Sequence, residues 1–220
     1  MPYRRISLTN EKLYHVFTRS IAGFKVFNSR YDFKRIVETM LFYSFKEPSC
    51  RFSFFIDRVK KGEEGNFLQL KSSERIVKIL AYCIMPTHIH IILEQLEDKG
   101  ISKYMNLVLK SYSKYFNVKY NRRGPLWEGR FKNVSIETDE QFMHLTRYIH
   151  LNPTSSLLVD NPEDWEFSSY KEYAGILAED KYMCDYYNFL DMDKAAYQAF
   201  VKDHVGYQRE LEKIKHLLME

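Results

Sequence analysis

The spacing of hydrophobic residues along the chain changes between a period of two and a helical period, and each period predicts a type of element. Alternation rich in β-branched and aromatic residues predicts strands at 13–20, 75–85, 88–95 and 126–137. Apolar residues three and four apart predict helices at 31–45, 101–121 and 139–151. The expected order is therefore β, α, β, β, α, β, α. Short helices are expected to follow at 186–190, 195–200 and 208–218.

Prolines and a polar segment set the expected limits of these elements. Pro86 is expected to interrupt one continuous strand or to mark a bulge, and Pro153 is expected to end the third helix after Leu151. Thr138 is the expected N-cap of that helix. The polar segment 47–65 is expected to be a loop or an excursion, with room for a short strand or helix.

This order of elements predicts an α+β fold, in which helices cover one face of an antiparallel sheet. The same order is found in the split β-α-β arrangement of ferredoxin-like folds. A length of 220 residues fits one domain with an appendage. We expect the domain to span 1–175 and a short helical extension to span 176–220.

Composition excludes several classes of protein. Hydrophobic residues make up 45% of the chain, but no stretch approaches the roughly 18 to 20 apolar residues of a membrane helix. No apolar signal-peptide segment follows the basic start of the chain, so a cytoplasmic location is expected. The three cysteines have no CxxC spacing, which argues against a disulfide framework and against a cysteine zinc site.

Positive charge is concentrated in one part of the chain. Residues 176–220 hold nine acidic and six basic residues, so the total charge of +4 leaves +7 for residues 1–175. Between 103 and 132 there are eight basic residues and one acidic residue, which favours a polyanion as partner. The candidate DNA contacts in this segment are Lys110, Lys114, Arg122, Arg123, Trp127, Arg130 and Lys132.

Two of these contacts have an equally simple structural interpretation. Lys110 and Lys114 lie one helical turn apart, and such a pair either contacts a nucleic-acid backbone or forms a solvated helix face. Trp127 lies between Arg123 and Arg130, where it either stacks on a base or fills the core beneath its loop.

Two histidines carry the strongest chemical signal. His88 and His90 are two apart in a predicted strand, so both imidazoles point to the same face and can reach one cation or one phosphate group. A solvated or hydrogen-bonded pair of polar side chains is the alternative. Because His15, His144 and His150 have no zinc-site spacing, a third ligand must come from elsewhere.

A tyrosine and an asparagine in the third predicted helix complement the histidines. Tyr148 and Asn152 are four apart, which places them on one helical face about 6 Å apart along the axis. The amide oxygen of Asn152 suits a hard cation such as Mg²⁺ or Mn²⁺. Tyr148 alone is most simply a packing residue, but a phenolate is both a nucleophile for phosphate and a tolerable leaving group. The combination predicts cation-assisted attack of tyrosine on phosphate.

An ordered series of motifs resembles a known family. The motif MPTHIHIILE is similar to the HUH motif (histidine, bulky apolar residue, histidine) of single-tyrosine endonucleases. The whole series resembles the REP-associated tyrosine transposases, relatives of the single-strand insertion-sequence transposases, over residues 1–175. Its members are YHVFTRSIAGFKVF, MPTHIHIILE, YFNVKYNRRGPLWEGRFKNVSIE, YIHLNP and DWEFSSY.

The resemblance implies a ferredoxin-like HUH nuclease core that acts on single-stranded or hairpin DNA through a 5′-phosphotyrosine intermediate. It implies that His88 and His90 bind Mg²⁺ or Mn²⁺, that Tyr148 is the nucleophile, and that Asn152 takes the place of a third polar ligand. It does not explain the acidic tail. The pattern leaves both a monomer and a homodimer open.

Two other functions remain as alternatives. A domesticated relative would bind a DNA hairpin without turnover, but a pure binder has no need of His88, His90, Tyr148 and Asn152 together. A cation-dependent hydrolase of small phosphoesters is disfavoured by the basic segment and by the lack of a third strong ligand.

Overall fold

A four-stranded antiparallel sheet forms the centre of the protein. The computed structural model describes residues 8–46, 48, 50–62 and 74–207. The strands lie in the order β2-β3-β1-β4, and each strand is antiparallel to its neighbours. They are β1 (Leu13–Arg19), β2 (Val77–Met85), β3 (His88–Gln95) and β4 (Lys132–Ile136). This arrangement confirms the predicted α+β fold with a ferredoxin-like order of elements.

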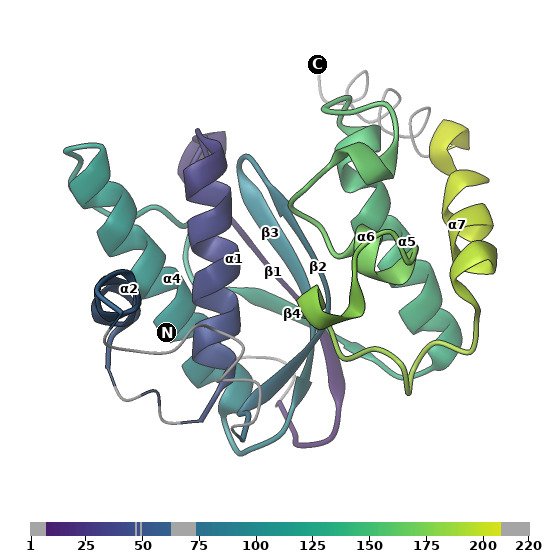
Figure 1. The fold of residues 1–220 in the computed structure, drawn as a ribbon, viewed down its shortest axis with the longest axis horizontal. Coiled ribbons are helices and arrows are strands. Elements are labelled where there is room, and N and C mark those ends of the chain that lie inside the picture. The colour runs from purple at the N-terminus through teal and green to yellow at the C-terminus, as the bar shows by residue number, and fades with distance from the viewer. Residues whose placement is uncertain (1–7, 47, 49, 63–73, 208–220) are drawn as a thin grey trace.

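Helices cover both faces of the sheet (Figure 1). One face carries α1 (Arg30–Ser44), α2 (Phe52–Lys60) and α4 (Gly100–Lys119). The other carries α5 (Asp139–Ser155), α6 (Tyr170–Tyr173) and α7 (Lys194–Lys202). Three short 3₁₀ turns occupy Ile21–Gly23, Pro162–Asp164 and Glu179–Lys181. The expectation of helices on one face was wrong, because strands β2 and β3 are buried along nearly their whole length and need cover on both sides.

Local sequence signals explain where the long helices lie. The buried stripe of α4 includes Ile101, Met105, Val108 and Tyr112, at the spacing of one helical face. In α5 the Thr138 side chain accepts a hydrogen bond from the Gln141 backbone N–H, as expected of an N-cap.

Pro86 lies in a tight turn and does not interrupt a strand. Met85 of β2 pairs with His88 of β3, so Pro86 and Thr87 connect the two strands of an antiparallel hairpin. The prediction of an interrupted strand or a bulge at this proline was wrong, because its fixed φ suits the turn. The register shift in this pair lies between Ile79 and Ala81.

Pro153 lies inside α5, which continues to Ser155. The prediction that Pro153 ends the helix was wrong, because a proline in the last turn removes only one backbone N–H and little of the helix remains beyond it. The excursion at 47–65 contains helix α2 among its described residues, as the sequence allowed.

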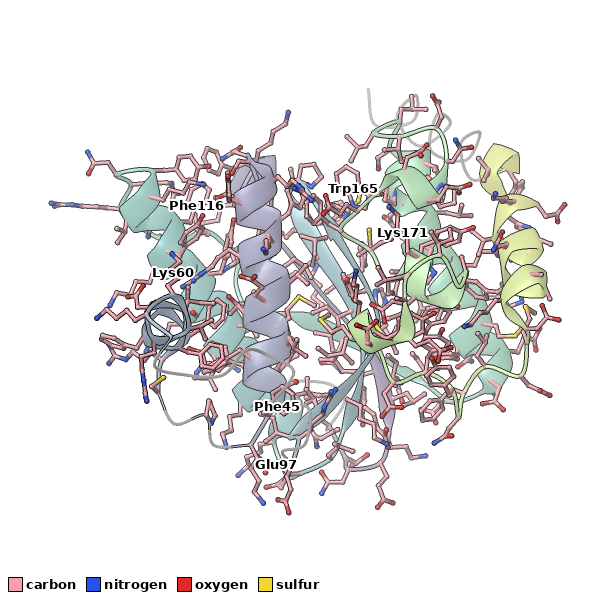
Figure 2. The ribbon with its side chains drawn as sticks, in the orientation of Figure 1. Phe45, Lys60, Glu97, Phe116, Trp165 and Lys171 are labelled. Carbon is pink, nitrogen blue, oxygen red and sulfur yellow. The ribbon has the colours of Figure 1, made fainter. Side chains whose placement is uncertain are left out.

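The described part of the C-terminal segment packs into the core of the preceding domain. Cys184, Tyr186, Tyr197 and Val201 belong to the main hydrophobic cluster. The helix predicted at 195–200 is confirmed as α7. A short helix was also expected at 186–190, but this segment contains a turn. The helix expected at 208–218 lies outside the described residues. Upstream, Trp165 lies beside the sheet, where its Nε1 donates to the Ile84 carbonyl (3.1 Å; Figure 2). Among the described residues, no helix is long and apolar enough to cross a membrane.

Candidate active site on the helix α5 face of the sheet

Strands β1 and β3 bring three histidines to one face of the sheet. In the register of this pair, His15 lies opposite Ile92, Phe17 opposite His90, and Arg19 opposite His88. Because alternate residues of a strand share a face, His15 and Arg19 lie on the same side of the sheet as the His88 and His90 pair. Helix α5 covers this side (Figure 1).

The two histidines of the HxH motif stand close together. Their ring centroids are 5.1 Å apart and the rings are perpendicular. The Nδ1 atom of His88 lies 3.0 Å from Thr87 Oγ1. His90 is 6% exposed, and burial, with smaller contributions from His88, His15 and Arg19, holds its pKa well below the usual range. A neutral imidazole of this kind has a lone pair available for a cation.

Tyr148 lies over this pair. Its ring centroid is 5.7 Å from that of His90, with the two rings perpendicular, and the side chain is 38% exposed. Two tyrosines of α4 make hydrogen bonds elsewhere in the protein. Tyr112 is fully buried and donates to the Val26 carbonyl, and Tyr115 donates to Asp32 (3.0 Å).

Asn152 lies one helical turn beyond Tyr148. Its Nδ2 donates to the Tyr148 carbonyl (2.8 Å), which fixes the amide and leaves Oδ1 as the atom with acceptor capacity for a cation. Two imidazole nitrogens and one amide oxygen fit Mg²⁺ or Mn²⁺. Within the described residues, no group of three His, Cys, Asp or Glu side chains is placed to hold a metal.

His15 contacts the HxH pair directly, which the sequence did not predict. Its Nε2 lies 2.9 Å from His90 Nδ1, and both side chains are buried. Burial lowers the pKa of His15 to about 4, so this ring is also neutral. Alternation along LYHVFTRS places His15 on one face with Phe17 and Arg19, but the pairing register with β3 cannot be read from the sequence.

A hollow of about 540 Å³ opens beside Tyr148. It lies between α5 and β4, and its lining includes His15, Glu140, His144 and Tyr148. Tyr148, the candidate nucleophile, and His15, which contacts His90, therefore line the same hollow.

Most of the basic residues predicted to contact DNA lie away from this site. Lys110 and Lys114 lie on α4, on the opposite face of the sheet, where they line a hollow of about 620 Å³ with Arg35, Arg51 and Lys119. Arg130 lines a hollow of about 740 Å³ that also includes Lys110 and Trp127. Lys132, the first residue of β4, lies opposite Phe17 of β1 and therefore on the face of the sheet that carries the histidines. Arg123 is exposed in the connection that follows α4.

Two members of the basic segment have structural contacts. Trp127 is 8% exposed, its Nε1 donates to Ser113 Oγ (3.0 Å), and its ring packs near Phe27 and Tyr112. Trp127 was expected either to stack on a base or to fill the core. These contacts favour the core-filling role, because the indole packs the loop against α4. Arg122 donates to the Gly124 carbonyl (3.3 Å) and lies over the ring of Phe24.

Comparison with known proteins relates part of this chain to a known family. The family model for IS200-like transposases matches residues 47–152. Over this range the chain is similar to the IS200-like transposases. The matched range contains His88, His90, Tyr148 and Asn152, whereas strand β1 with His15 and helix α7 lie outside it.

Two relatives extend the comparison. A Haemophilus influenzae protein described as a REP-associated tyrosine transposase is 28% identical over 102 residues, covering 41% of this chain. The match spans 57% of the length of that relative. A solved structure of a REP-associated tyrosine transposase bound to a REP hairpin matches with a TM-score of 0.52 and 18% identity, covering 89% of this chain and 96% of that one. At this identity the second match shows that the chain shares its fold.

Proposed function

We propose that this protein cleaves and rejoins single-stranded DNA through a covalent 5′-phosphotyrosine on Tyr148, with Mg²⁺ or Mn²⁺ at His88, His90 and Asn152. The observation that carries the proposal is the placement of Tyr148, whose ring centroid lies 5.7 Å from that of His90. Both residues belong to the same chain, so Tyr148 acts beside the histidines of its own subunit.

The chemistry exchanges one phosphoester bond for another. The Tyr148 oxygen attacks the scissile phosphorus, the bond from phosphorus to the 3′ oxygen breaks, and the phenolic proton passes to solvent while the 3′ oxygen gains a proton. The products are a 5′-phosphotyrosine and a free 3′-OH. Attack by a 3′-OH on the phosphotyrosine reverses the exchange and restores the phenol, because a phenolate is an acceptable leaving group.

The residues around Tyr148 have separate tasks in this scheme. The cation, when bound, neutralises charge on the phosphate and polarises the scissile bond. His88, His90 and Asn152 hold it, and the Asn152 amide is kept in place by its hydrogen bond to the Tyr148 carbonyl. Arg19, opposite His88 on the same face, supplies a permanent positive charge for the phosphate backbone.

DNA is the proposed partner, in single-stranded or hairpin form. The basic segment supports this, and the structural relative described as bound to a REP hairpin supports a hairpin substrate. Lys110 and Lys114, in their hollow with Arg35, Arg51 and Lys119, provide a concentrated positive surface for a phosphate backbone.

A covalent trapping experiment tests the proposal. Single-stranded hairpin DNA labelled at its 3′ end is incubated with the protein and Mn²⁺, and the products are separated on a denaturing gel. We expect a labelled protein–DNA adduct whose modified peptide, identified by mass spectrometry, contains Tyr148. Tyr148→Phe removes only the hydroxyl and should abolish the adduct while leaving hairpin affinity unchanged.

Tyr31→Phe is the matched control, because Tyr31 is 79% exposed on α1, on the other face of the sheet. It should form the adduct at the wild-type rate. Cleavage by Tyr148→Phe at the wild-type rate, or an adduct on another tyrosine, would contradict the assignment of the nucleophile. Cleavage without any adduct would indicate a hydrolase, and hairpin binding without cleavage would indicate a binding protein.

A further inference from the structure

We propose that His15 is a positioning residue that fixes the tautomer and orientation of His90, so that the Nε2 atom of His90 is presented to the cation. This inference rests on the proposed function of the same site. It concerns a residue of β1, outside the region that matches the family model.

The geometry at His90 supports this assignment. His90 Nδ1 and His15 Nε2 lie at hydrogen-bond distance, 2.9 Å apart, inside the protein. A hydrogen bond between two neutral imidazoles needs one N–H and one lone pair. When His90 Nδ1 carries the proton and His15 Nε2 accepts it, His90 Nε2 keeps its lone pair. In the reverse arrangement, His90 Nε2 carries the proton and cannot bind a cation.

The surroundings of His15 restrict how the ring can move. It stacks on Phe17 of the same strand, with centroids 5.0 Å apart, and runs nearly parallel to His90, with an angle of 18° between the rings. His15 is 8% exposed and borders the hollow beside Tyr148. Because Phe17 and His90 both contact the His15 ring, His15 can hold His90 in one orientation. A residue that hydrogen-bonds to a metal-binding histidine commonly sets the tautomer of that histidine and its affinity for the metal.

A pair of substitutions separates the hydrogen bond from packing. His15→Phe keeps an aromatic ring next to Phe17 but removes the acceptor for His90 Nδ1. His15→Gln places an amide oxygen near the former Nε2 position and keeps the acceptor. We expect His15→Phe to weaken Mn²⁺ binding by about 10- to 100-fold and His15→Gln to stay within about threefold of wild type. The dissociation constant is measured from the electron paramagnetic resonance signal of free Mn²⁺, without DNA or turnover.

A second measurement needs no variant. In the metal-free wild-type protein, long-range ¹H–¹⁵N correlation spectra of the imidazoles should show His90 protonated at Nδ1. The signals are assigned by comparison with His90→Gln. The same spectra of His15→Phe should show a mixture of His90 tautomers.

The outcomes are distinguishable. A wild-type Mn²⁺ affinity in folded His15→Phe would overturn the inference and leave the proposed function intact. His90 protonated at Nε2 in the wild-type protein would also overturn it. If wild type and His90→Gln bind Mn²⁺ equally, the cation site of the proposed function is wrong, and the inference about His15 falls with it.

Discussion

The Nδ1 atom of His150 and the hydroxyl of Tyr197 lie 2.7 Å apart, which joins the tyrosine-bearing helix α5 to the C-terminal helix α7. On the other side of the ring, Nε2 lies 2.8 Å from Ser169 Oγ, which in turn accepts a hydrogen bond from the Tyr82 backbone N–H of β2. His150 is fully buried, and burial lowers its pKa to about 3. Since His150 lies midway between Tyr148 and Asn152, these bonds hold the centre of α5 between the sheet and the tail.

Tyr197→Phe should loosen α5. The substitution removes the hydroxyl and leaves a buried imidazole nitrogen without this partner, so we expect the free energy of unfolding to fall by about 1 to 2 kcal/mol. Hydrogen–deuterium exchange should become faster at the amides of α5, and urea unfolding measures the loss of stability.

Tyr186→Phe is the control for this prediction. Tyr186 is a buried tyrosine of the same segment, but its hydroxyl donates to the Glu172 carbonyl (2.9 Å), away from α5. We expect a comparable loss of stability without a local change in α5 exchange. Equal changes in α5 exchange for both variants would show that the His150–Tyr197 bond has no specific role.

His88→Ala and His90→Ala should each abolish Mn²⁺-dependent cleavage and largely spare DNA binding. Each removes one imidazole from the candidate cation site, whereas the affinity for DNA comes mainly from contacts with phosphates elsewhere. Gel-based cleavage and fluorescence anisotropy measure the two properties. His144→Ala, on the rim of the neighbouring hollow, should retain cleavage, and full activity in His88→Ala or His90→Ala would refute the cation assignment.

Lys110→Gln with Lys114→Gln should flatten the salt dependence of DNA binding. Each lost phosphate contact on a single strand lowers the slope of log affinity against log salt by about 0.7, so the double variant should lose about 1.4. Anisotropy titrations from low to moderate salt provide the slope. The control is Lys171→Gln, in α6, with Lys181→Gln, in the 3₁₀ turn Glu179–Lys181. An unchanged slope for the α4 pair would place the DNA surface elsewhere.

Asp32→Asn should destabilise the contact between α1 and α4. Asp32 is fully buried at the start of α1 and accepts hydrogen bonds from Lys119 (2.7 Å) and Tyr120 (2.6 Å) at the end of α4. Burial alone would raise the pKa of this carboxyl, but hydrogen bonds from Lys119, Tyr120, Ser29 and Tyr115 lower it below its usual value. We expect the variant to lose about 2 kcal/mol at neutral pH.

The pH dependence of this difference gives a further check. Because the pKa of Asp32 is lower in the folded state, its charge stabilises the fold above the unfolded value near about 4, and this contribution disappears as the pH falls through the folded pKa. The gap between wild type and Asp32→Asn in urea unfolding should therefore shrink in acid. The exposed Asp191→Asn should match wild type throughout, and a gap that stays constant into acid would contradict the ionic role of Asp32.

The sequence by itself determined the types of the main elements and the shared face of the HxH pair. The stripe of α4 and the Thr138 cap are local patterns, and local patterns depend only on residues within a few turns of each other. The common face of His88 and His90 follows from the two-residue period of any strand. The one-turn spacing of Tyr148 and Asn152 follows in the same way from the period of a helix.

Only the tertiary structure decided which of these faces meet. The contact between His15 and His90 depends on the register of β1 against β3, and a one-residue slip would send His15 to the other side of the sheet. Trp127 is buried because its loop packs against α4. The C-terminal segment is held against α5 by the hydrogen bond between Tyr197 and His150. These contacts join residues far apart in the chain, and their energies come from burial and hydrogen bonds that form only after the elements have assembled, so no local period contains them.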